Sequence, residues 1–307
     1  MKIVLRLITA IAAAAVLICF SSCSMNTYPN ADKYTVGNRE INDKIKNLDI
    51  DWVSGDITIS FHDSDTVKVE ERCSDDLKDS KKLHTWVDGD TLHVRFCKSG
   101  EMMLFKTPEK DLEILLPKDT KLSELSLDGS SCDCDVRDLT AETIKADVSS
   151  GDLKFIDCSA DTFDMDTSSG NVTIVQKGSS DSINIDTSSG DAEVTAEKVG
   201  KVSFDTSSGD ISVNVGKADR ISTDASSGRT EIKVDEMPSK IKVDSSSGDV
   251  TLRVPRSADF EAEIDTSSGE FYSELPLSKN GDTYISGSGG NEISIDTSSG
   301  DISIISG

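Results

Sequence analysis

The chain has 307 residues, of which 36% are hydrophobic and 5% aromatic, enough apolar material for one or two folded units rather than a disordered chain. Its 56 acidic residues outnumber 32 basic residues and give a formal charge of −24. Because such an excess of negative charge repels phosphate backbones, nucleic acid is not expected as a partner. Divalent cations remain compatible with this composition.

Residues 1–22 are typical of an export signal. Lys2 and Arg6 precede an apolar run over residues 7–20, which is too short to span a bilayer comfortably. The run leads into the letters FSSC, which resemble the lipobox of bacterial lipoproteins. By that resemblance Cys23 becomes the lipidated mature N-terminus; a plain secretory signal cleaved nearby is the alternative. We therefore expect an extracytoplasmic protein, anchored through this lipid to the cell membrane or envelope.

The next two segments precede the regular part of the chain. Residues 23–38 are polar and lack apolar periodicity, so they are predicted to be the lipidated cysteine and a flexible tether. Residues 39–121 contain alternating apolar and polar stretches, such as residues 67–72 and 91–96. They are predicted to form a β-rich N-terminal cap, which includes a first coil and shields its edge from other chains.

Residues 122–307 repeat a polar phrase whose commonest form is Asp-Thr-Ser-Ser-Gly-Asp. The leading Asp recurs every 19–21 residues in the first eight copies, and 31 residues separate the last two. A period near twenty residues is typical of a solenoid. The long last interval predicts an insertion near residues 277–290, after which the final phrase forms the last coil. The leading residues are Asp128, Asp147, Asp166, Asp186, Asp205, Asp224, Asp244, Asp265 and Asp296, with an earlier relative at Asp51.

Apolar and polar residues alternate at period two around each phrase, which predicts strands rather than helices. In residues 182–195, for example, Ile183, Ile185, Ala192 and Val194 share one parity. No single coil can bury that face, so successive coils must stack, with parallel strands in register. The predicted fold is all-β: a right-handed parallel β-helix or β-solenoid of about nine to ten coils of 19–21 residues, with the N-terminal β cap.

The phrase itself is explained by the geometry of a corner. Its Gly supplies a positive φ angle, and its leading Asp is predicted to accept hydrogen bonds from the N–H groups that follow. The Thr column shares the inward parity and predicts packing rather than a ligand ladder. A weaker alternative is a cation ladder, because calcium prefers oxygen ligands. That ladder would comprise Asp166, Asp186, Asp205, Asp224 and Asp244.

Four stretches carry a family resemblance: LDIDWVSGDITI at residues 48–59, DLEILLPKDTKLSELSL at residues 111–127, the repeated TSSGD, and the closing ISIDTSSGDISI. With these stretches the chain resembles a bacterial envelope family of unknown function with β-strand repeats, labelled "putative adhesins". The resemblance covers nearly all of residues 38–307. It implies a lipid-anchored β-solenoid without established catalytic residues, and some relatives are associated with envelope-stress signalling.

Catalytic and metal motifs are absent from the sequence. There is no His-Glu-x-x-His and no strand-to-helix Gly-x-Ser-x-Gly, so no catalytic residue, cofactor or metal site is predicted. Five cysteines remain after Cys19 and Cys23, an odd number; Cys73 and Cys97 are candidates for a cap disulfide. The favoured function is a non-enzymatic, surface-exposed adhesin or interaction scaffold that contacts a protein or glycan. The alternative is an envelope-stress sensor acting with a membrane partner; a polysaccharide-active β-helix enzyme is less favoured.

Overall fold

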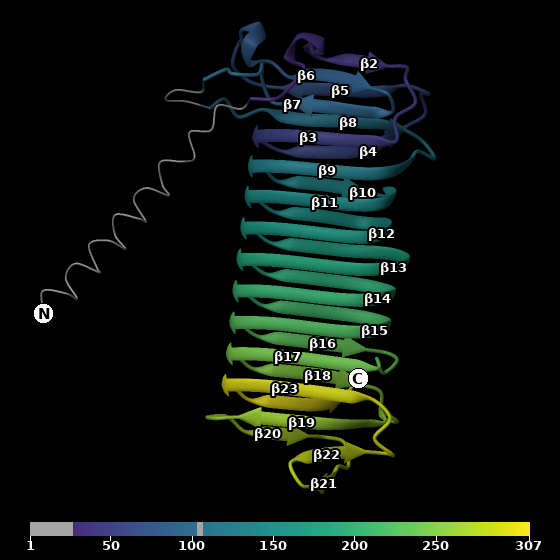
Figure 1. Cartoon of the computed structure of the whole chain (residues 1–307), viewed down its shortest axis with the longest axis vertical. Coiled ribbons are helices and arrows are strands. Elements are labelled where there is room, and N and C mark those ends of the chain that lie inside the picture. The colour runs from purple at the N-terminus through teal and green to yellow at the C-terminus, as the bar shows by residue number, and fades with distance from the viewer. Residues whose placement is uncertain (1–26, 103–106) are drawn as a thin grey trace, which may run out of the picture.

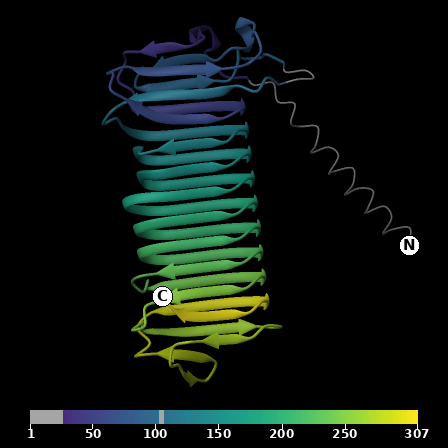
Figure 2. The same ribbon diagram turned by 180° about the vertical axis from the view of Figure 1, so that it is seen from behind.

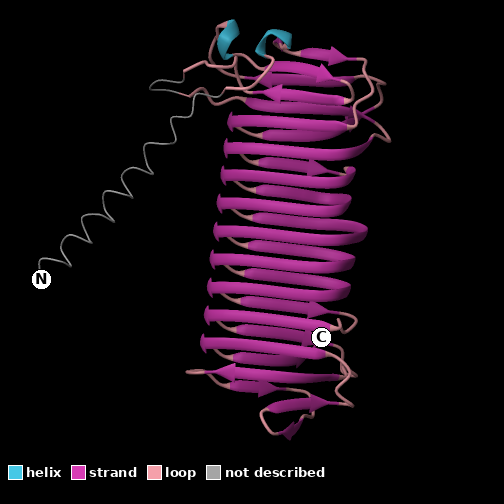
Figure 3. Ribbon diagram, viewed as in Figure 1, coloured by secondary structure: helices cyan, strands magenta, loops and turns pink. Residues whose placement is uncertain are grey.

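The protein is a straight stack of β-strands closed at one end by a cap (Figures 1 and 3). The computed structural model describes residues 27–102 and 107–307. All 24 strands of this part belong to one sheet, accompanied by two short 3-10 helices, η1 (Ala31–Lys33) and η2 (Asp79–Lys81). We call residues 27–121 the cap and residues 122–307 the rod. The view from behind shows the same stack of levels (Figure 2).

The cap holds eight strands that run in both parallel and antiparallel directions. They are β1 (Thr35–Val36), β2 (Arg39–Ile41), β3 (Asn47–Ser54), β4 (Ile57–His62), β5 (Val67–Arg72), β6 (His84–Asp88), β7 (Thr91–Arg95) and β8 (Asp111–Pro117).

The rod holds the remaining strands, several of which run 17 or 18 residues through a bend. They are β9 (Lys121–Ser131), β10 (Cys134–Arg137), β11 (Thr140–Ser150), β12 (Leu153–Ser169), β13 (Val172–Ser189), β14 (Ala192–Ser208), β15 (Ile211–Ser227), β16 (Thr230–Val234), β17 (Lys240–Ser247), β18 (Val250–Val254), β19 (Phe260–Thr266), β20 (Phe271–Ser273), β21 (Ser278–Asn280), β22 (Thr283–Ser286), β23 (Glu292–Ser299) and β24 (Ile302–Ser306).

The coils stack in register, which confirms the predicted β-solenoid. Each phrase lies beside the equivalent phrase of its neighbour, so that Asp166 pairs with Asp186 and Asp186 with Asp205. Within the described ranges these parallel pairings define eleven levels, ten of which carry the phrase or its relative. At about 4.8 Å per level, the stack is about 50 Å long.

The core is a single column of apolar side chains inside the coils. The residues assigned an inward parity are buried: Ile183, Ile185, Ala192 and Val194 are at most 2% exposed. One cluster of buried apolar residues continues from Ile41 to Ile304. Because each coil covers the apolar face of the next, stability is shared between levels rather than held within one coil.

The glycine of most phrases is required by two separate constraints, whereas Gly269 and Gly300 lack the positive φ angle and meet only the second. Gly170, Gly190 and Gly209 have φ angles of 147°, 147° and 146°, a region that residues with a Cβ atom rarely adopt. A Cβ atom on Gly190 would also lie 2.0 Å from the carbonyl oxygen of Gly170. The corner backbones therefore stack too closely for any side chain at this position.

The order of levels at the N-terminal end differs from the order in the chain. Strand β3 lies between β7 and β9, and β4 lies between β8 and β10. The first coil in the sequence is thus the second level in space, and β7 and β8 fold back to form the outermost one. Antiparallel strands then close the edge, since β1 and β6 extend from β7 while β2 and β5 extend from β8.

The C-terminal end shows a similar inversion, which corrects one expectation. Strand β23 lies between β17 and β19, and β24 lies between β18 and β20. The final phrase was expected to form the last coil, but it forms the second-last level, and the coil of Asp265 is outermost. The hairpin β21–β22 covers the edge of β19, and Gly307 hydrogen bonds to Val254 of β18 (Figure 1).

The segment after the predicted lipidation site also differs from expectation. Residues 23–38 were expected to form a flexible tether, but from Tyr28 on the chain packs against the cap. Tyr28 is 9% exposed, and its hydroxyl donates a hydrogen bond of 2.9 Å to the carbonyl oxygen of Cys97. Strand β1 then pairs with β6. The physical reason is that the aromatic rings of Tyr28 and Tyr34 pack against the cap, which removes apolar surface from water.

We predict that Gly190→Ala lowers the melting temperature more than Gly178→Ala does. Gly178 has a φ angle of 76° and open space around it, so its substitution costs only the backbone strain, about 1–2 kcal/mol. Gly190→Ala adds a clash with the neighbouring coil. Thermal unfolding followed by circular dichroism measures both, and equal losses would show that the corner can open to admit a methyl group.

Candidate functional site

A shallow groove runs along the rod over the leading Asp residues. It has a volume of about 500 Å³ and crosses several levels. One of its walls is the file of leading carboxylates, and the other is the column two positions earlier in each coil. We call it the acidic groove; the polar residues that line it are Ser126, Asp128, Lys145, Asp147, Asp164, Asp166, Asn184, Asp186, Ser203 and Asp205.

The carboxylates in this groove repel one another. Partial burial raises the pKa of Asp166, and the charges of Asp147 and Asp164 raise it further. The pKa of Asp186 is raised in the same way, by burial and then by Asp166 and Asp205. Lys145 does not neutralise them, because its ammonium lies 3.0 Å from Glu124. The groove is therefore a strip of negative potential.

The leading Asp does not cap the corner, contrary to the expectation from the sequence. In the described part of the chain, no hydrogen bond or ion pair holds the carboxylates of Asp166, Asp186 or Asp205. They project from the rod with no partner in the described residues.

The trailing Asp, which follows the Gly, performs the structural role. The Oδ1 atom of Asp152 accepts the backbone N–H of Asn171 at 3.0 Å, and Asn171 accepts that of Asp191 at 2.9 Å. Asp191 in turn accepts the N–H of Asp210 at 2.9 Å. Each of these three side chains thus ties its own coil to the next one, and the second Asp of the phrase is explained by this ladder. Sequence reasoning assigned the hydrogen bonds to the wrong Asp of the pair.

The proposed cation ladder is a single file of side chains. Asp166, Asp186, Asp205, Asp224 and Asp244 do stack, one level apart. Over residues 27–102 and 107–307, however, no group of three or more His, Cys, Asp or Glu side chains is arranged to hold a metal ion. Cys23, the predicted lipidation site, lies outside the described residues.

The Thr column faces the interior. Thr167, Thr187, Thr206 and Thr297 are at most 3% exposed, and their hydroxyl oxygens have no hydrogen-bond partner in the described part of the protein. These side chains pack against the core, as their parity predicted, and cannot reach a ligand outside the rod.

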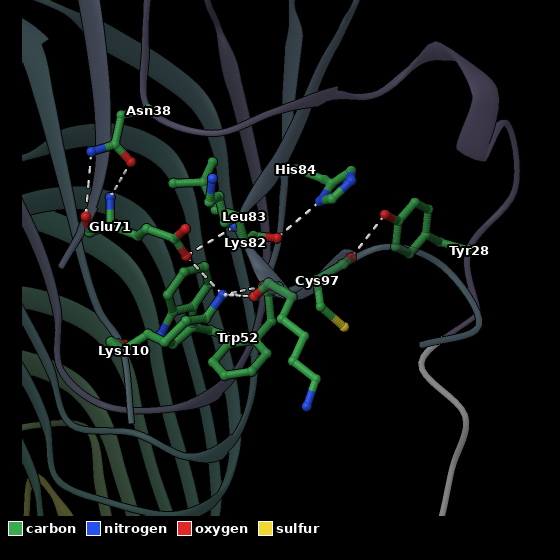
Figure 4. A network of polar contacts seen from close by, with 11 residues as sticks. Tyr28, Asn38, Trp52, Glu71, Lys82, Leu83, His84, Cys97 and Lys110 are labelled. Atoms are coloured by element: carbon green, nitrogen blue, oxygen red, sulfur yellow. Dashed lines mark hydrogen bonds and ion pairs between the residues drawn. The ribbon is translucent and has the colours of Figure 1, made fainter. Parts of the chain in front are cut away.

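A buried lysine joins the strands of the cap (Figure 4). The ammonium of Lys110 is 2.7 Å from a carboxylate oxygen of Glu71 and donates to the carbonyl oxygens of Lys81 and Phe96. It also lies 4.9 Å from the ring centre of Trp52, whose indole N–H donates back to the carbonyl oxygen of Lys110 at 2.8 Å. This network connects β3 and β5 with the residues that flank β7 and β8.

Burial governs the chemistry of this network. It lowers the pKa of Lys110, although the charge of Glu71 opposes the change. The Lys110 side chain is fully buried, and that of Glu71 is 8% exposed. A charge pair taken so far out of water holds only while both partners are present. We assign the network a structural role.

The cysteines do not form the candidate disulfide. Cys73 and Cys97 are both free thiols, as are the other three described cysteines. Burial raises the pKa of Cys97 to about 11 and that of Cys132 to about 12. Because the thiolate is the reactive form, these buried thiols are poor nucleophiles at neutral pH.

One histidine makes a contact that resembles part of a catalytic dyad. The Nδ1 atom of His93 lies 2.5 Å from a carboxylate oxygen of Asp49. Arg95 binds both oxygens of the same carboxylate. Burial opposes ionisation of Asp49, but the hydrogen bonds and charge of Arg95, together with His93, outweigh it and lower the pKa. Trp86 stacks on His93 at 5.2 Å, so the ring is covered on one face.

Comparison with known proteins identifies the family. Residues 45–240 and 233–305 match the Toastrack DUF4097 family. The chain belongs to this family. The Toastrack match therefore spans both ends of the stack, including the level of β3 and β4 and the inverted levels at the C-terminus. Curated proteins offer no similar sequence.

Three solved structures from Bacteroides and Parabacteroides species are similar to this chain. One from Bacteroides fragilis is named a "putative adhesin", with 17% identity, a TM-score of 0.46, and coverage of 72% of this chain and 97% of that chain. A "putative lipid binding protein" from Parabacteroides distasonis has 15% identity, a TM-score of 0.47, and coverage of 90% and 97%. A "putative adhesin" from Parabacteroides merdae has 13% identity, a TM-score of 0.44, and coverage of 88% and 96%. These likenesses concern the fold alone.

We predict that Asp191→Ala lowers the free energy of unfolding by about 1 kcal/mol, because the backbone N–H of Asp210 loses its acceptor. Asp186→Ala, five residues away, is expected to cost nothing at neutral pH. Asp191→Asn is the matched control, since Asn171 already fills the same role in the ladder. Denaturant unfolding measures all three variants, and a larger loss for Asp186→Ala would contradict the assignment.

The pH dependence tests the same distinction. A carboxyl group whose pKa is raised in the fold destabilises it at neutral pH, and the penalty disappears as the pH falls through that raised pKa toward the ordinary value of 3.8. The double variant Asp166→Asn/Asp186→Asn is therefore expected to be more stable than the native chain at neutral pH and equally stable below pH 3.8.

We predict that Lys110→Met destabilises the cap by about 3–5 kcal/mol, because it leaves the carboxylate of Glu71 buried without its cation. The double variant Glu71→Gln/Lys110→Met removes that charge and should recover part of the loss. Thermal unfolding checks both variants. A double variant no more stable than Lys110→Met would show that packing, rather than charge, sets the cost.

Proposed function

We propose that the protein is a non-enzymatic, lipid-anchored rod of the cell envelope, which acts as an adhesin or interaction scaffold. The acidic groove is the observation that carries the proposal. Carboxylates such as Asp166 and Asp186 stand in it without hydrogen bonds or ion pairs from the described chain, although partial burial and mutual repulsion disfavour their charge. Carboxylates without such contacts are available to bind a positively charged group of an external partner.

The chemistry of the groove indicates what kind of partner fits. A strip of negative potential attracts surfaces that present Lys or Arg side chains, or glycans that carry amino groups. Such contacts give specificity and fast association more than high affinity, and salt weakens them. A straight stack of hydrogen-bonded levels holds these carboxylates in a fixed array, which supports a scaffold role.

The same residues argue against the enzyme alternative. Burial raises the pKa of the Cys97 and Cys158 thiols, and Asp49, the carboxylate that contacts His93, is engaged by Arg95. The groove carboxylates recur from level to level, whereas a catalytic site needs one unique acid–base arrangement.

We expect Cys23→Ser to release the full-length protein from the membrane fraction, because the lipid attaches to that sulfur in the proposed anchor. The double variant Asp166→Asn/Asp186→Asn should remain on the membrane but lose most of its chemical cross-links to envelope components. Cell fractionation and cross-linking of intact cells measure the two effects.

The groove variant has a matched control in the double variant Asp191→Asn/Asp210→Asn, which also removes two charges but leaves the groove lining unchanged. Cross-links that persist in the groove variant at low salt would contradict the groove as the contact surface. Cross-links confined to an integral membrane protein would favour the envelope-stress regulator over the adhesin.

No helix in residues 27–102 or 107–307 is long and apolar enough to span a bilayer.

A further inference from the structure

The docked N-terminal segment shortens the connection between lipid and fold. The backbone N–H of Tyr28 donates to the hydroxyl oxygen of Ser99 at 3.0 Å, and that hydroxyl donates to the carbonyl oxygen of Tyr28 at 3.2 Å. The bond from the Tyr28 hydroxyl to the carbonyl oxygen of Cys97 (Figure 4) is the third hydrogen bond that fixes this residue to the cap. The chain is thus held from Tyr28 onward.

Chain geometry then limits how far the cap can stand from the membrane. Five peptide steps separate Cys23 from Tyr28, and a fully extended chain covers at most about 18 Å in that number of steps. A tether that was free as far as Asn38 would reach about 50 Å, the length of the whole stack. Docking of Tyr28 therefore reduces the largest possible distance between the lipid and the cap from about 50 Å to about 18 Å.

The face beside this connection has the composition of a membrane–water interface. Tyr34 and Trp86 are half-buried and their rings are 5.6 Å apart, and the ring of the buried Tyr28 lies 4.5 Å from that of Tyr34. The ammonium of Lys33 lies 4.7 Å from the Trp86 ring. Tyr and Trp with neighbouring basic residues are enriched where proteins meet lipid headgroups, because their rings are apolar at one end and polar at the other.

Two of the three large exposed apolar side chains among the described residues belong to the cap. Val36, in β1, is 41% exposed, and Met102, three residues after Ser99, is 53% exposed. The third large exposed apolar residue among those described, Tyr272, lies at the opposite end of the stack, in β20.

The difference in charge between the cap and the rod favours an orientation with the cap toward the membrane. The cap holds 20 acidic and 15 basic residues, a formal charge of −5, whereas the rod holds 36 acidic and 15 basic residues, a charge of −21. An anionic lipid surface therefore repels the rod far more than the cap.

From these observations we infer that the cap is a membrane-contacting surface: residues 29–36 hold it against the lipid headgroups, so that the rod points away from the bilayer. This inference rests on the proposed lipidation of Cys23. It adds an orientation and a partner, the lipid surface, and places the acidic groove and the C-terminal hairpin on the side away from the membrane.

The test measures energy transfer from a fluorescent label on the lipidated, full-length protein to a headgroup dye in liposomes of phosphatidylcholine with some phosphatidylglycerol. One label is placed at Lys98→Cys in the cap and another at Lys279→Cys in the hairpin, both exposed positions. Cys73→Ser removes the half-buried thiol, and the other described cysteines are buried. We expect strong transfer from position 98 and several-fold weaker transfer from position 279.

The second variant carries a flexible insert of twelve Gly and Ser residues before Thr27. This insert lengthens the connection between the lipid and the cap without altering the folded part of the chain. Transfer from position 98 should fall. The matched control is the same insert between Gly281 and Asp282, in the exposed turn of the β21–β22 hairpin, which should leave transfer from position 98 unchanged. Flotation of the liposomes shows independently whether the protein is anchored.

The outcomes separate the two proposals. Equal transfer from positions 98 and 279 in protein that floats would overturn the orientation and leave the lipid anchor intact. Unchanged transfer from position 98 after the N-terminal insert would overturn the short connection as the cause. Protein that fails to float would overturn the lipid anchor, and the orientation with it.

Discussion

The close stacking of one corner on the next is the constraint on which the rest of the structure depends. Where Gly190 lies over Gly170, the backbones approach so closely that no Cβ atom fits. That approach sets the register, and the register places every other residue of the phrase. The Thr enters the interior, the trailing Asp reaches the N–H of the next coil, and the leading Asp is left on the surface. One short phrase thus specifies a corner, a ladder and a charged groove together.

A stack of parallel strands has two open edges, and this protein closes each by breaking the order of the chain. At the N-terminal end, β7 and β8 cover the level formed by β3 and β4, and antiparallel strands cover them in turn. At the C-terminal end, the last coil inserts beneath the coil of Asp265, and a hairpin covers the outside. An unpaired edge strand can pair with strands of other chains. At both ends of this protein, short antiparallel strands therefore cover the outermost coil.

The two ends of the stack differ in chemistry as well as in shape. The cap contains the histidines, the tryptophans, the Lys110 network and nearly balanced charge, whereas the rod carries a charge of −21. Repetition explains the negative charge of the rod, because each added coil adds acidic residues to the same surface. The cap has no repeat to copy, and its contacts join residues far apart in the chain, such as Tyr28 with Ser99. The proposed division into a membrane-contacting end and a projecting rod follows from this difference.

The sequence by itself determined the β-solenoid, the inward parity of residues such as Ile185, the glycine corner and the stacked column of leading Asp residues. These features depend on periods of two and about twenty residues, which can be read directly from the sequence. Only the tertiary structure decided which Asp makes the hydrogen bonds, where the levels of β7 and β23 lie, and that Tyr28 docks on the cap. It also decided the burial of Lys110 against Glu71. These features are single events between distant residues, and a contact that occurs once leaves no repeating pattern in the chain.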